Sequence, residues 1–156
     1  MAKNVTRMSS EALAKRLAAL PQEIIAKVQP AIAKSVTEVA ADARTLAEAS
    51  RRSGDLIETI EATPPGGTTP DYASEGGQRT LHDLQGAVTV GSPDMRHGHL
   101  VEFDTAPHVN GGIFAGSQHP GTKAQPFLLP AWRLNRARVQ RRINSAVNKV
   151  IREASQ

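Results

Sequence analysis

The chain has 156 residues, a net charge of +4 and no cysteine. This length fits one domain, residues 1–156, and the lack of cysteine excludes disulfides, thiolate metal sites and cysteine catalysis, in agreement with a reducing cytoplasm. Only five residues are aromatic, so we expect a thin core that neighbours in an oligomer support. No apolar run approaches the about 20 residues of a membrane span, and no membrane partner is expected.

Residues 9–50 are predicted to be helical. Pro21 suits the first position of a second helix, and Pro30 is expected to kink or restart it. Apolar residues at steps of three and four mark one stripe on this helix of about 30 residues: Ile25, Val28, Ile32, Val36 or Val39, Ala43 and Leu46. The stripe predicts packing on a sheet, with a coiled coil as the alternative. Gly54 is a suitable helix stop.

Residues 54–125 are predicted to hold a small, mainly antiparallel sheet and two long loops. The predicted strands are residues 55–62, 80–84, 87–91 and 99–104. The last two are predicted to form a hairpin, because Ser92-Pro93-Asp94 supplies a turn between them and apolar residues alternate with acids after it. The loops, residues 63–79 and 106–125, are rich in Gly and Pro and are either functional or mobile.

An amphipathic helix is predicted over residues 131–154, after an extended segment at 126–130. Its apolar line is Trp132, Val139, Ile143, Ala146, Val147 and Val150. Its basic face is Arg138, Arg141, Arg142, Lys149 and Arg152. The predicted fold class is therefore α+β, with the long N-terminal helix and this C-terminal helix packed on one face of the sheet.

The signals for catalysis and for metal binding are weak. His97 and His99 would share one strand face, where Glu102, Asp104, His108 and His119 could complete a nitrogen and oxygen site. No HExxH pair, phosphate-binding loop or nucleophile elbow accompanies them. We therefore expect neither an enzyme nor a metal or cofactor.

Four short motifs, taken in order, carry a family resemblance. They are SGDL at 53–56, VTVG at 88–91, VEFDT at 101–105 and PFLLPA at 126–131. The chain resembles the neck or tail-completion proteins of long-tailed bacteriophages, often labelled minor tail component, whose members typically carry Val-Glu-Phe-Gly-Thr and Pro-Phe-Leu-x-Pro-Ala. Asp104 stands where the family usually has Gly, a position that is expected to need positive φ, which Asp tolerates.

The resemblance implies a structural virion protein at the head-to-tail junction, assembled in the bacterial host cytoplasm. It would form a ring, expected to be hexameric, that joins the connector and head-closure proteins to the tail terminator or tail tube and lets genomic DNA pass. One alternative is the tail terminator itself. The other is a sequence-independent nucleic-acid-binding protein that uses the basic C-terminal helix.

Three groups of residues are the predicted functional set. The core anchor of the last helix is Phe103, Phe127, Leu128, Leu129 and Trp132. The contacts with other subunits or partners are Glu102, Asp104, Thr105, His119 and Pro120. The basic helix face is expected to serve assembly or to tolerate DNA nearby.

Overall fold

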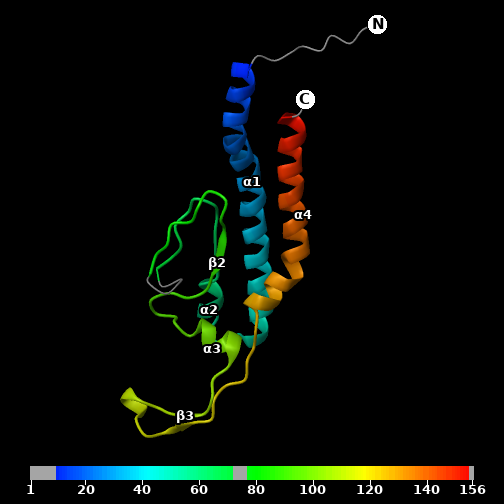
Figure 1. Ribbon diagram of the computed structural model, residues 1–156. Helices are drawn as coiled ribbons and strands as arrows, with labels where there is room; N and C mark the ends of the chain where they lie inside the picture. Colours follow the sequence, from blue (N-terminus) through cyan, green and yellow to red (C-terminus); the bar gives the residue numbers. More distant parts are fainter. Residues whose placement is uncertain (1–9, 72–76, 155–156) are drawn as a thin grey trace.

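The computed structural model describes residues 10–71 and 77–154 (Figure 1). In chain order the elements are α1 (Ser10–Ala47), the 3-10 helix η1 (Glu48–Ser50), α2 (Asp55–Glu58), β1 (Glu61–Thr63), β2 (Ala87–Thr89), α3 (Gly98–Phe103), β3 (His108–Val109), the 3-10 helix η2 (Gly112–Phe114), β4 (Gln118–His119) and α4 (Leu128–Ala154). The fold is α+β, as predicted, and most of its regular structure is helical.

Helix α1 is continuous over 38 residues, so the prediction of a separate helix that begins at Pro21 is wrong. Pro30 lies inside the helix, where a proline removes one backbone hydrogen bond. Pro30 is exposed, while Val28 and Ile32 on either side of it are buried. Burial of the apolar stripe therefore offsets the local cost of the proline.

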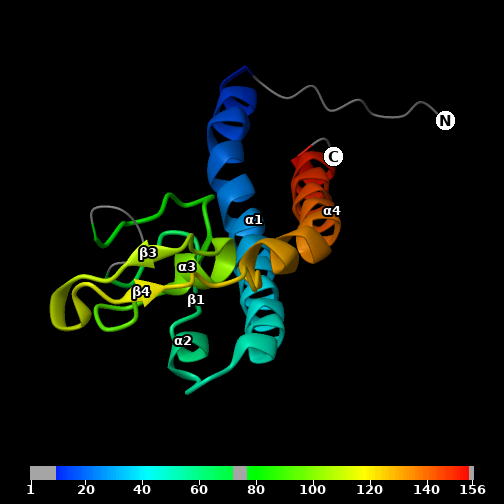
Figure 2. The same cartoon turned by 90° about the horizontal axis from the view of Figure 1, so that it is seen from below.

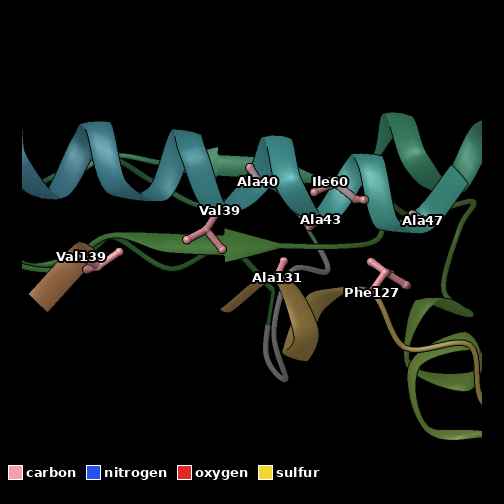
Figure 3. Close-up of a cluster of buried hydrophobic side chains, with 8 residues drawn as sticks. All are labelled: Val39, Ala40, Ala43, Ala47, Ile60, Phe127, Ala131 and Val139. Atoms are coloured by element: carbon pink, nitrogen blue, oxygen red, sulfur yellow. The ribbon is translucent and has the colours of Figure 1, made fainter. Parts of the chain in front are cut away.

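Helix α1 lies between α4 and the ribbon of β1 and β2 (Figures 1 and 2). Helices α1 and α4 run antiparallel, because Asp42 near the end of α1 contacts Asn135 and Lys27 contacts Glu153. Figure 3 shows the core cluster where the end of α1 meets the start of α4. Its buried members are Val39, Ala40, Ala43, Ala47, Ile60, Phe127, Ala131 and Val139. Four of the eight are alanines, so the core is as thin as the composition suggests.

The short ribbon before α3 pairs β1 with β2 in antiparallel register, from Glu61 opposite Thr89 to Thr63 opposite Ala87. Gly86 leads into β2, and a Cβ there would lie 2.7 Å from Cγ1 of Val36 on α1. Only glycine therefore lets the ribbon approach α1 this closely.

Two predicted strands are wrong. Residues 98–103 form helix α3, so β2 pairs with β1 and not with this segment. Residues 55–58 form helix α2, and the strand begins only at Glu61. Gly54 does not stop α1, which ends at Ala47; with φ of 101° it is the N-cap residue of α2.

The described parts of both predicted loops contain ordered structure; residues 72–76 of the first loop lie outside the described residues. In the first, the backbone N–H of Thr69 donates to the Arg79 carbonyl, and the buried Thr69 hydroxyl accepts a hydrogen bond from the Arg79 N–H. The predicted strand at 80–84 is reduced to a single bridge between Thr68 and Thr80. In the second, β3 and β4 pair as an antiparallel arm that projects from the body (Figures 1 and 2).

Candidate assembly surfaces

The predicted anchor of α4 is only partly buried. Phe127 is 1% exposed, and Leu128 is half-buried against the core cluster. Phe103 is 61% exposed, Trp132 44% and Leu129 40%, so their assignment to the core of the single chain is wrong. The physical reason for Phe103 is that it ends a helix instead of lining the inner face of a strand.

The buried residues at the start of α4 recur every four positions. They are Phe127, just before the helix, and Ala131, Asn135 and Val139 within it. Trp132 lies about 100° around the helix from Ala131 and misses this line. Asn135 is fully buried, and its amide donates to Asp42 Oδ2 at 2.6 Å and to the Ala131 carbonyl at 2.9 Å. The sequence analysis missed this buried polar residue, although its spacing in the step could have found it.

The predicted basic face of α4 divides into two groups. Arg142 bonds Glu38 at 2.7 Å and donates to Ser35 Oγ at 2.8 Å, both on α1. Arg138 contacts Glu38 at 3.4 Å and Asp42 at 3.7 Å. The hydrogen bond from Arg142, with the charges of both arginines, lowers the pKa of Glu38 below its ordinary value. Both cations therefore pair with acids on α1. Arg142 lies partly buried between the helices, so its assignment to an outward basic face is wrong, whereas Arg138 remains exposed.

The remaining cations of α4 are exposed. Arg141, Lys149 and Arg152 line a shallow hollow of about 520 Å³ along the helix. Arg133 and Arg136, which the sequence analysis did not include, are also exposed. We use "basic outer face" for Arg133, Arg136, Arg141 and Lys149, which take part in none of the ion pairs between described residues.

Glu102 joins α3 to the first turn of α4. Its side chain is buried, and its carboxylate accepts the backbone N–H groups of Phe127 at 2.8 Å, Leu128 at 2.9 Å and Leu129 at 2.8 Å. The next residue, Pro130, has no N–H to offer. Glu102 thus accepts all three N–H groups of residues 127–130. Its negative charge lies at the N-terminal end of α4, where the helix dipole favours an anion. It is an internal cap, and its prediction as a contact with a neighbour is wrong.

Asp104 ends α3 with φ of 81° and ψ of 176°. Among the residues that the structure describes, it is the one non-glycine residue with positive φ. The sequence analysis expected positive φ here, and that expectation is confirmed. The ψ value places Asp104 outside the left-handed helical region, in backbone space that glycine almost alone occupies.

The β3–β4 arm begins where Thr105 and Thr122 face each other. Their backbones exchange two hydrogen bonds of 3.1 Å, and their hydroxyls lie 2.9 Å apart. Further out, the rings of His108 and His119 stack with centroids 4.9 Å apart. Pro120 is exposed beside them. Three predicted contact residues, Thr105, His119 and Pro120, therefore lie together along the arm, and their contact with a partner stays a prediction.

The tip of the arm exposes large apolar side chains. Ile113 is 97% exposed, Phe114 71% and Val109 57%. Asn110 holds the turn by donating to Ser117 Oγ at 2.9 Å. The sequence analysis placed these apolar residues in a loop without selecting them; an Ile-Phe pair inside a Gly-rich segment was the available signal.

The histidines are arranged differently from the predicted metal site. His97 precedes α3 and His99 lies in it, so the two do not share a strand face. His97, His108 and His119 line a cavity of about 460 Å³ with Leu56 and Leu100. Across residues 10–71 and 77–154, no three His, Asp or Glu side chains gather as a metal site would require.

Comparisons with protein-family models, curated proteins and solved structures find no match. In the described part of the chain, no helix has both the length and the apolar character needed to cross a membrane.

Proposed function

We propose that the protein is a structural virion component of a tailed bacteriophage, a neck or tail-completion protein at the head-to-tail interface. Copies of the chain form a ring, expected to be hexameric, that joins the connector to the tail tube and lets the genome pass. The role is geometric, because each subunit supplies surfaces to its neighbours and to the proteins above and below.

The main support for the proposal is a set of hydrogen bonds that joins two motifs of the family resemblance. Glu102 belongs to the segment 101–105, and it caps the backbone of the segment 126–131. The two motifs are thus one structural unit, in which Pro130 removes the last N–H donor that the cap would have to satisfy. Asp104 adds support, since it has positive φ where the family usually has Gly.

The arm supports an assembly role. The hydrogen-bonded hairpin exposes Ile113 and Phe114 at its tip, and exposed apolar groups of this kind mark surfaces that other proteins cover. The small, alanine-rich core of the single chain agrees with a protein that gains stability from neighbours.

Sequence-independent nucleic-acid binding is the second candidate, because the basic outer face leaves four cations available to phosphates. Arg138 and Arg142 are held by acids on α1, so the face has fewer cations than the sequence suggested. The ring proposal accounts for the two motifs and for the arm, whereas DNA binding accounts for neither.

The test is the assembly state of the purified full chain, by light scattering and electron microscopy. A closed ring whose lumen admits duplex DNA supports the proposal, and labelled antibody should then locate the protein at the head-to-tail junction of virions. A chain that stays monomeric at every concentration and is missing from virions would refute it. Submicromolar affinity for duplex DNA at about 0.15 M salt, without a ring, would favour the second candidate.

A phage that lacks the gene distinguishes the neck protein from the tail terminator. Filled heads beside finished tails that do not join would place it in the neck. Tails of irregular length would instead place it at the tail terminator.

A further inference from the structure

The two flanks of α1 carry opposite charge. Residues 128–154 of α4 have seven basic residues and one acidic residue, a net charge of +6. On the other side of α1, residues 48–71 and 77–97 have seven acidic and four basic residues, a net charge of −3. Figures 1 and 2 show α1 between these two parts in both views.

The positive flank has an exposed surface with both charge and apolar area. Arg133, Arg136 and Arg141 belong to the basic outer face, and the apolar side chains of Leu129, Trp132 and Leu134 are 40%, 44% and 69% exposed on the same stretch of α4. Cations around partly exposed apolar side chains are typical of a protein interface, where arginine and tryptophan are enriched.

The negative flank has three acids that are close in the chain. Asp55 and Glu58 stand three residues apart on α2, and Glu61 opens β1. We use "acidic face" for these three residues. Each successive pair lies at most about 11 Å apart along the chain. All three are exposed, and they enter none of the ion pairs found between described residues.

We propose that the basic outer face of one copy docks on the acidic face of the next copy and forms the subunit interface of the ring. This inference rests on the ring proposed above. The two faces cannot meet within one chain, because α1 separates them. A two-fold dimer cannot join both at once either, since they lie on opposite flanks. Association therefore runs head to tail, and it ends when the ring closes.

Like charges oppose the competing arrangements. Two basic outer faces, or two acidic faces, repel each other across a contact, and such juxtapositions suppress wrong pairings. The charge pattern thus selects the direction of assembly, and the apolar groups on α4 supply burial once the faces meet.

Charge reversal tests the inference. The basic-reversed variant is Arg133→Glu, Arg136→Glu and Arg141→Glu. The acid-reversed variant is Asp55→Lys, Glu58→Lys and Glu61→Lys. Each alone should weaken self-association by about 100-fold, as like charges replace several attractive pairs. Both reversals in one chain should restore the ring.

Mixing gives a sharper result. In the basic-reversed chain three glutamates stand beside Lys149 on the outer face of α4, so both docking faces are acidic; in the acid-reversed chain both docking faces are basic. An equimolar mixture should therefore form rings in which the two chains alternate. Light scattering and native mass spectrometry report the stoichiometry. The matched control is Lys123→Glu with Asp94→Lys, two exposed positions outside both faces, which should leave the ring intact. Circular dichroism confirms that every variant is folded.

Several results would overturn the inference. Rings that survive both reversals would refute this interface while leaving the ring itself established. If only the basic reversal matters and duplex DNA binding disappears with it, the α4 surface binds nucleic acid instead. A wild-type chain that never assembles would refute the proposed function, and this interface with it. If rings do form, raised salt should weaken them, because salt screens the exposed charges of the two faces.

Discussion

The helical body, made of α1, α4 and the elements packed on α1, differs from the β3–β4 arm in how its side chains are buried and paired. In the body, Phe127 and Ile60 are buried, and the carboxylate of Glu102 is fully engaged by backbone N–H groups. In the arm, polar groups are paired while Ile113 and Phe114 face solvent. The body therefore has a buried apolar core of its own, whereas the arm is ordered without one and leaves its apolar surface for another molecule.

Order in the arm has a consequence for binding. Hydrogen bonds between Thr105 and Thr122, the stack of His108 on His119 and the bond from Asn110 to Ser117 hold the hairpin without an apolar core. A partner that covers the tip does not have to pay for ordering it, so more of the apolar burial appears as affinity.

The largest expected effect is in the body. Phe127→Ala should lower the free energy of unfolding by about 4 kcal/mol, because it empties a fully buried site in a small core. Trp132→Ala is the matched control, and its exposed ring should cost only about 1 kcal/mol. Urea denaturation measures both. Equal losses for the two variants would contradict this assignment of the core.

Glu102→Ala should cost about 3 kcal/mol, because three backbone N–H groups at the start of α4 lose their acceptor. Glu102→Gln keeps one acceptor oxygen, so its free energy of unfolding should lie between those of Glu102→Ala and the wild type. Exposed Asp94→Ala serves as the control and should stay within about 0.5 kcal/mol. A Glu102→Ala protein as stable as the control would mean that water replaces the cap.

Asp104→Gly should stabilise the protein by about 1 kcal/mol, since glycine relieves the strain of positive φ and loses part of that gain to the entropy of the unfolded chain. Asp104→Ala keeps the strained backbone and should bring no gain. Thermal unfolding of the two variants tests the difference. A gain from alanine equal to that from glycine would show that the aspartate charge, and not its backbone, is unfavourable.

Acid should weaken the contact between α1 and α4. Because Arg142 lowers the pKa of Glu38 in the folded state, the contribution of this carboxylate is fully present above its ordinary value of 4.5 and is lost as the pH falls through the lowered folded value. The stability difference between wild type and Glu38→Gln should therefore shrink below about pH 4.5. A difference that stays constant down to pH 3, the lower end of the titration, would exclude this pair as the cause.

The sequence predicts the helices better than the segments between them. The apolar stripe of α1 is a local pattern, and Val28, Ile32 and Ala43 are buried as it predicts. The predicted partner was a sheet, whereas α1 packs mainly on α4. The alternation at 99–104 favours a strand, but the helix places Glu102 under the start of α4. That tertiary gain overrides a weak local preference. The ion pairs of Arg138 and Arg142 could not be predicted for a similar reason, because their partners on α1 lie about a hundred residues away in the chain.

The arm tip should show the smallest effect on stability. Ile113→Ser with Phe114→Ser removes no buried contact, so the free energy of unfolding should change by less than about 0.5 kcal/mol. The same variant should fail to join its partner, whether that is another subunit or an adjoining virion protein, because exposed apolar area of this kind drives association. Ser117→Ala, which removes one bond inside the tip and leaves the apolar pair, controls for a damaged hairpin. Complementation of a phage that lacks the gene, read as joined virions, measures the loss. If the doubly substituted chain assembles and complements fully, the tip is not a contact, and the contrast between body and arm has no functional meaning.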